Sequence, residues 1–189
     1  MSKLNHIFPS EFIFWAKAKN HLVNKNFLYE TIMVSLDTTK DKHIGHWKCN
    51  VNTEFFTNSD TYVKYIDLVV NDIYPALDCM FNEIPIKTPK SSKVKNIWYN
   101  YYEQGHNQEI HTHTPNSNLS GIYLLHLEEK NKTVFYSYNS SICGLSNPDK
   151  QLVEAEEGDI IIFPSVLLHY VMPCEKPRAT IAFNIECIW

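Results

Sequence analysis

The 189-residue chain is poor in glycine, with five in all, and has no glycine-rich loop of the kind that cradles phosphate groups. Its longest uncharged apolar tract, Ile160 to Cys174, is too short to span a bilayer and is interrupted by two prolines and a histidine. The amino terminus lacks the long apolar stretch of a secretory signal. We therefore expect a soluble cytoplasmic protein that has no membrane partner.

Cysteine pairs and excess positive charge are also missing. The cysteines are odd in number, widely spaced and without a C-x-x-C motif, which excludes a zinc finger or redox pair and favours free thiols in a reducing compartment. The 17 Lys and Arg residues are outnumbered by 21 Asp and Glu residues, so the chain lacks the basic surface expected of a nucleic-acid-binding protein. We predict no nucleic-acid partner.

The sequence does contain enough apolar material, 44% of its residues, for a single domain with a sizeable core. Residues 1–92 are predicted to form a helical cover with the first strands, and residues 93–189 a jelly-roll catalytic core. The predicted fold class is mainly β with α: a double-stranded β-helix, or jelly roll, whose N-terminal helices cover one sheet.

In the N-terminal region, Pro9 to Val23 and Tyr62 to Phe81 carry apolar residues at roughly helical spacing. Asn58 to Asp60 offer N-cap chemistry before the second of these helices, and Pro75 interrupts it. Leu28 to Leu36 is predicted to be a strand. The prolines between residues 85 and 92 indicate a linker.

From Val94 onward, short strand-like runs alternate with turn-like ones. The predicted strands are Val94–Tyr102, Gln108–His113, Ser120–Leu127, Thr133–Tyr138, Asp159–Phe163, Leu167–Met172 and Ala179–Cys187. In and beside the last of them, Ile181, Phe183, Ile185 and Cys187 are apolar at odd positions, whereas Arg178, Thr180, Asn184 and Glu186 are polar at even ones, which places the two sets on opposite faces. If helices cover the apolar face, Arg178, Thr180 and Asn184 line a cavity instead of facing solvent.

Three histidines suggest a metal site. His111 and His113 stand at positions i and i+2 of a predicted strand, so their imidazoles share a face with Cα atoms roughly 6.5 Å apart. A pair of solvent-facing histidines would give the same pattern. His169 lies in an apolar tract, where an unsatisfied imidazole would be costly. A single core histidine bonded to a backbone carbonyl explains His169 alone, whereas a metal site explains all three together.

Arg178 and Thr180 form a second candidate binding site. A guanidinium and a hydroxyl on one strand face suit a carboxylate ligand better than a hydrophobic core. The alternative is a surface arginine that pairs with Glu175 or Glu186.

Together these motifs resemble the 2-oxoglutarate/Fe(II) oxygenases found in phages and marine bacteria, which are relatives of the prolyl-hydroxylase-like dioxygenases. The resemblance covers about residues 96–185, with Gly45-His46-Trp47 as a fainter match upstream. It rests on Trp98-x-Asn100, Gly105, Gln108, His111-x-His113, Ser120-Gly-Ile-Tyr123, Gly158-Asp-x-x-x-Phe-Pro-Ser-x-x-x-His169 and Arg178-x-Thr180-x-x-Phe-Asn184.

The resemblance implies Fe(II) held by His111, His113 and His169 at one end of a jelly roll. The wider superfamily uses two histidines and one carboxylate, so this chain departs from the pattern at His113. Glu109 shares the predicted face of His111 and is a fallback carboxylate, although it stands on the wrong side of the pair for the usual H-x-D order.

The resemblance further implies 2-oxoglutarate as co-substrate, converted to succinate and carbon dioxide while a substrate C–H bond is hydroxylated. Arg178 would hold its distal carboxylate with help from Thr180, and Asn100 and Tyr123 are weaker candidates for the pocket wall. Asn184 and Gln108 are candidates for facing the substrate. That substrate, a small molecule or a peptide, is not indicated by the sequence, and neither is the oligomeric state.

Two alternatives stay open. A cupin-like three-histidine metal enzyme would use the same ligands without 2-oxoglutarate and would have no need for Arg178-x-Thr180. A non-catalytic β-sandwich with a structural zinc ion would want four protein ligands, and His106 is the spare histidine nearby.

Overall fold

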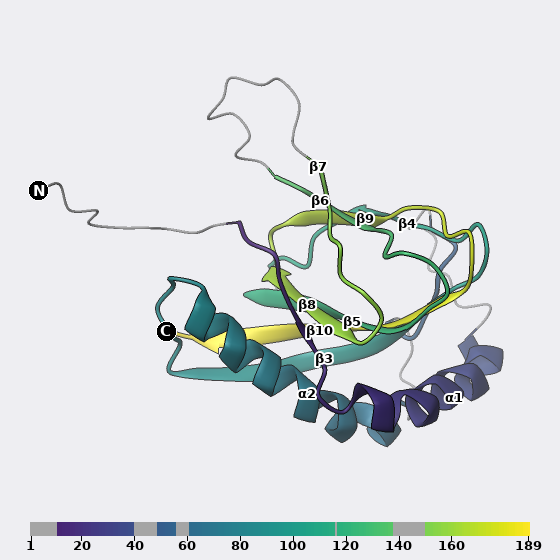
Figure 1. Ribbon diagram of the computed structural model, residues 1–189, viewed down its shortest axis with the longest axis horizontal. Coiled ribbons are helices and arrows are strands. Elements are labelled where there is room, and N and C mark those ends of the chain that lie inside the picture. Colours follow the sequence, from purple (N-terminus) through teal and green to yellow (C-terminus); the bar gives the residue numbers. More distant parts are fainter. Residues whose placement is uncertain (1–10, 40–48, 56–60, 116, 138–149) are drawn as a thin grey trace, which may run out of the picture.

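The computed structural model describes residues 11–39, 49–55, 61–115, 117–137 and 150–189, which form two antiparallel sheets and two helices. In Figure 1 the helices lie along one face of the larger sheet, and the smaller sheet lies over its other face. The larger sheet has the order β1 (Phe14–Lys17), β8 (Asp159–Pro164), β5 (Leu119–Leu127), β10 (Arg178–Ile188), β3 (Ser91–Tyr102) and β2 (Asn52–Thr53). The smaller sheet has the order β4 (Gln108–His111), β9 (Leu168–Val171), β6 (Thr133–Tyr136) and β7 (Lys150–Leu152).

The predicted alternation of the last strand is confirmed. β10 lies in the middle of the larger sheet, between β3 and β5. Ile181, Phe183 and Ile185 belong to the main core, which the helices complete. The even-numbered side chains of Arg178, Thr180 and Asn184 are nevertheless buried, because the smaller sheet covers that face. A polar row between two sheets is the framework of an internal site.

Helix α2 (Thr61–Glu83) matches the predicted helix within two residues at each end. Its buried apolar residues recur every three or four positions, as the helical period requires; they are Tyr65, Val69, Ile73, Ala76, Leu77, Met80 and Phe81. The helix continues through Pro75. The proposed N-cap residues Asn58 to Asp60, like Gly45 to Trp47, lie outside the described residues.

The two other N-terminal assignments were wrong. Within the predicted helix Pro9 to Val23, Phe14–Lys17 form β1, which pairs with β8 at the edge of the sheet. Helix α1 (His21–Thr39) begins later and runs through the predicted strand Leu28 to Leu36. Leu28, Ile32 and Leu36 are spaced four apart and buried against the sheet. Because apolar residues also occupy the outer face, the helical period was hidden in the sequence.

In the described part of the second half, each predicted strand is present, and its ends differ from the prediction by at most three residues. β3 begins at Ser91, inside the predicted linker, and the three-residue β7 was not predicted. Among the described helices, neither is long and apolar enough to cross a bilayer.

Gly121 allows close packing at the centre of the larger sheet. It lies opposite Phe183 of β10, and a Cβ atom added there would come within 2.1 Å of the Phe183 ring and 2.7 Å of the Ile161 carbonyl oxygen. We expect Gly121→Ala to lower the free energy of unfolding by roughly 2–4 kcal/mol, because neither neighbour can move away in a packed sheet. Urea unfolding measures the difference.

Gly105→Ala is the matched control. Gly105 has φ +82° and nothing within 4 Å of the added Cβ, so its replacement costs only the left-handed backbone strain, about 1 kcal/mol. Equal losses for the two variants would contradict the packing argument.

Candidate metal centre

The smaller sheet brings the three histidines together. β4 and β9 pair so that His111 and His169 are direct neighbours across the strands. His113 lies just past the end of β4, where its backbone N–H donates to the Ser165 carbonyl at 2.9 Å. One side-chain nitrogen from each of the three residues lies within 4.8 Å of the other two. This is the only such group of His, Cys, Asp or Glu side chains among the described residues.

Hydrogen bonds orient each imidazole. The Nδ1 atoms face oxygen acceptors: the Glu109 carbonyl for His111 (2.7 Å), Asn184 Oδ1 for His113 (2.9 Å) and the Leu167 carbonyl for His169 (3.0 Å). Because a carbonyl oxygen can only accept, each Nδ1 must carry the hydrogen, and the lone pair then sits on Nε2. The Nε2 atoms of His113 and His169 lie 3.3 Å apart. Two lone pairs that face each other at this distance suit a cation placed beside both.

The protonation state also suits a metal. Burial lowers the pKa of all three imidazoles, to about 4 for His113 and well below the usual value for His169. His111 lowers the pKa of His113 further, and both of them lower that of His169, because positive charges would lie close together. The histidines are therefore neutral near pH 7, the form that binds metal ions.

Aromatic rings enclose the cluster. Phe163 meets the His169 ring edge-on with centroids 4.8 Å apart, and Phe135 stacks on it at 5.6 Å. Trp98 stacks on His113 at 5.7 Å. Their packing restricts rotation of the imidazoles, and it keeps the surroundings apolar on the inner side.

Arg178 lies in the same cavity with its charge uncompensated. Its side chain is 1% exposed, and no ion pair of the described residues includes it. Nη2 donates to Thr133 Oγ1 at a long 3.4 Å and the guanidinium lies 5.1 Å from the Tyr102 ring centre, while Nε and Nη1 have no hydrogen-bond partner in the described structure. A buried guanidinium with open N–H groups is a receptor for an anion.

The surface role considered for Arg178 is wrong. Glu175 pairs with Lys132 at 3.0 Å and Glu186 with Lys95 at 3.6 Å, both on the exterior. Burial lowers the pKa of Arg178 from its usual value, but a guanidinium stays charged at neutral pH.

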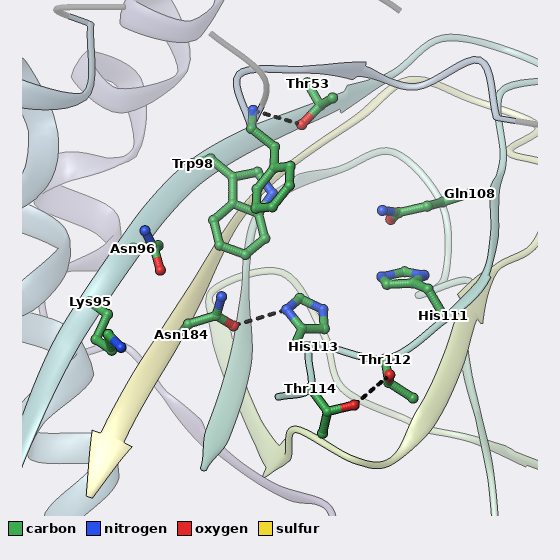
Figure 2. A pocket seen from close by; sticks show the side chains of 11 residues that line it. Thr53, Lys95, Asn96, Trp98, Gln108, His111, Thr112, His113, Thr114 and Asn184 are labelled. Atoms are coloured by element: carbon green, nitrogen blue, oxygen red, sulfur yellow. Dashed lines mark hydrogen bonds between the residues drawn. The ribbon is translucent and has the colours of Figure 1, made fainter. Parts of the chain in front are cut away.

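The cavity divides into two parts, which we call the inner and outer pockets. The inner pocket, of about 20 Å³, contains Arg178, Thr180, Asn100 and Thr133 beside the histidines. The outer pocket, of about 530 Å³, opens outward from His113 and is lined by Asn184 and ten other residues (Figure 2). Trp98, Gln108, His111 and His113 border both pockets. A metal ion at the histidines would therefore stand between them.

Three sequence-based candidates lie elsewhere. Tyr123 points to the helix-covered face, where its hydroxyl meets His21 Nδ1 at 2.8 Å, so the expectation that it walls the co-substrate pocket was wrong. Glu109 contributes its backbone carbonyl to His111, and its carboxylate is not part of the histidine group. His106 is not part of that group either.

The structure adds residues that sequence reasoning missed. Thr133 and Tyr102 line the inner pocket, and the Tyr102 hydroxyl donates to Gln108 Oε1 at 2.8 Å. Asn184, predicted to face the substrate, does line the outer pocket and also accepts the hydrogen bond from His113. The sequence signal that could have found Tyr102 is its place among the aromatic residues of β3, beside Trp98, Tyr99 and Tyr101.

The site can now be compared with known proteins. Residues 96–184 match the family described as "Putative 2OG-Fe(II) oxygenase". This match covers a little under half of the chain and shows a similarity to that family. It coincides with the segment on which the sequence resemblance rested. No curated protein sequence matches the chain significantly.

Three solved structures have a similar fold. A Pseudomonas putida prolyl-4-hydroxylase is 10% identical with a TM-score of 0.58, and covers 94% of each chain. A Trichoplax adhaerens prolyl hydroxylase in complex with a hypoxia-inducible-factor peptide is 9% identical with a TM-score of 0.64, over 93% of this chain and 83% of its own. The α-ketoglutarate-dependent epimerase SnoN of nogalamycin biosynthesis is 11% identical with a TM-score of 0.60, over 94% and 78%. The predicted double-stranded β-helix with N-terminal helices is thus confirmed.

Proposed function

We propose that this chain is an Fe(II)- and 2-oxoglutarate-dependent dioxygenase that hydroxylates a small molecule or a peptide. The observation that carries the proposal is the buried guanidinium of Arg178, which has no acidic partner among the described residues and lies in the cavity of the three histidines. A structural metal site needs no anion receptor, whereas a site for a dicarboxylate co-substrate does.

The donor set fits the metal. His111, His113 and His169 would hold the cation through three neutral imidazole nitrogens, and His111 and His113 border both pockets. Bound Fe(II) supplies the activation of oxygen and the oxidative decarboxylation of 2-oxoglutarate to succinate. A closed structural zinc site would require a fourth protein ligand, and no fourth ligand belongs to this group among the described residues.

The chain's own contribution is to bind and orient. Arg178 would take the distal carboxylate of 2-oxoglutarate through two parallel N–H groups, with the Thr180 hydroxyl beside it. Asn100 adds a buried amide to the wall of the inner pocket, and only the amide's NH2 group could donate to a carboxylate of the co-substrate. The aromatic rings around the histidines keep bulk water away from the reacting groups.

Co-substrate entry requires side chains to move. The inner pocket of about 20 Å³ holds a water molecule, but not a five-carbon dicarboxylate. Trp98 and Gln108, which border both pockets, are the side chains placed to open it. We therefore expect 2-oxoglutarate to bind by induced fit.

The test is an anaerobic titration of the Fe(II)-loaded protein with 2-oxoglutarate. A weak visible charge-transfer band is expected, because the 2-oxo acid chelates the metal. Succinate is the matched control: it has the distal carboxylate but no 2-oxo group, so it should compete for binding without producing the band. If fully loaded protein gives no band, the cupin-like enzyme without 2-oxoglutarate becomes the better assignment.

A further inference from the structure

The outer pocket has a distinct chemical character. Its described lining includes one ammonium group, that of Lys95, and no carboxylate. The remaining polar groups are neutral: the imidazoles of His111 and His113, the indole of Trp98, and several amides and hydroxyls (Figure 2). A cationic ligand would therefore meet no carboxylate among the described residues that line this pocket.

If the proposed function is correct, the metal centre and Arg178 place further positive charge beside the outer pocket. Three neutral imidazoles leave the two positive charges of Fe(II) uncompensated, and the Arg178 guanidinium adds a third. The two carboxylates of 2-oxoglutarate cancel two of these charges. In a site with two histidines and a carboxylate, the protein ligand would cancel the last one. Here one positive charge remains beside the outer pocket, in addition to Lys95.

One wall offers an apolar platform. The Phe55 side chain is 48% exposed and meets the ring of Trp98 edge-on, with centroids 4.8 Å apart. Trp98 in turn stacks on His113. A flat ring that covers the exposed surface of Phe55 would lie next to the metal centre and bury apolar area on both partners.

We propose that the outer pocket binds the substrate, and that this substrate is a small organic anion: a flat ring that packs on Phe55, with a carboxylate or phosphate group that contacts Lys95. The volume of about 530 Å³ is in the usual range for such a ligand. Glu186, which is half exposed and outside the pocket, pairs with Lys95 at 3.6 Å and would compete with the ligand for the ammonium.

The experiment uses protein loaded with Zn(II) and 2-oxoglutarate, which cannot turn over. Binding of phenylacetate, phenyl phosphate and the cationic phenethylamine is measured by ligand-observed NMR. Both anions are expected to bind at least tenfold more tightly than the amine, and the stronger of the two identifies the acidic group. Lys95→Gln should weaken anion binding roughly fivefold, and Glu186→Gln should strengthen it.

Lys93→Gln is the matched control, because Lys93 is an exposed lysine of the same strand that does not line the pocket. Equal binding of anions and amine, or equal effects of the two lysine variants, would overturn the proposal. The same samples report 2-oxoglutarate binding beforehand. A protein that binds 2-oxoglutarate but shows no anion preference refutes only this inference, whereas a protein that fails to bind 2-oxoglutarate refutes the proposed function.

Discussion

Arg178→Met is expected to lower the affinity for 2-oxoglutarate by about 100-fold or more while leaving the apoprotein as stable as the original chain, or more stable. Loss of one partner from a buried, hydrogen-bonded charge pair costs about 3–5 kcal/mol, which corresponds to that change in affinity. Stability should move the other way, because the guanidinium of the apoprotein is buried without an acidic partner among the described residues. Methionine has a similar volume and removes the buried charge.

The opposite effects on stability and affinity make this variant informative. Isothermal titration with 2-oxoglutarate measures the affinity, urea unfolding of the apoprotein measures the stability, and Co(II) titration checks that the metal still binds. Arg178→Lys is the matched control: it keeps the charge but loses the planar fork, so an intermediate affinity is expected. A methionine variant that loses metal and 2-oxoglutarate equally, or that unfolds more easily, would show that Arg178 is structural.

The helices and strands were predicted more accurately in the second half of the chain than in the first, and this difference has a physical explanation. In β10, apolar Ile181, Phe183 and Ile185 alternate with polar Thr180 and Asn184, apart from Ala182, and this pattern correctly predicted both faces of the strand. In α1, apolar residues point both inward, as Leu28 and Ile32 do, and outward, as Val23 and Val34 do. A helix with two apolar faces has the same local composition as a buried strand, so the sequence alone favoured the wrong element.

The site was predictable where its residues share one strand or one motif. His111-x-His113 and Arg178-x-Thr180 each follow the two-residue period of a strand, and both pairs line the cavity. The prediction for Tyr123 was wrong because the register of the sheet decides whether the even-numbered or the odd-numbered side chains of β5 face the cavity. Ile122 lines the inner pocket and Tyr123 faces the helices. The register is set by pairing with β8 and β10, which the spacing of residues within β5 does not reveal.

His169→Leu is expected to abolish metal binding in practice, with affinity lowered by more than 100-fold. Changes to groups that merely orient a ligand cost 10–100-fold, so removal of a ligand should exceed this range. In the original chain, Zn(II) or Co(II) at 100 times its dissociation constant should raise the free energy of unfolding by about 2.7 kcal/mol. The leucine variant should show no such rise in the free energy of unfolding when metal is added. It should still fold, because its neighbours Phe135 and Phe163 can pack against an apolar side chain.

Two further variants distinguish residues that bind the metal from a residue that only orients a metal ligand. Asn184→Ala removes the acceptor that orients His113 and should weaken metal binding by about 10–100-fold, since His113 can then turn its Nε2 away. His126→Gln replaces a histidine outside the cluster and should leave the metal affinity unchanged. Cobalt absorption spectra measure all three variants on one scale. If His126→Gln weakens binding as much as His169→Leu, the metal binds elsewhere, and the three imidazoles that converge between the pockets are not its ligands.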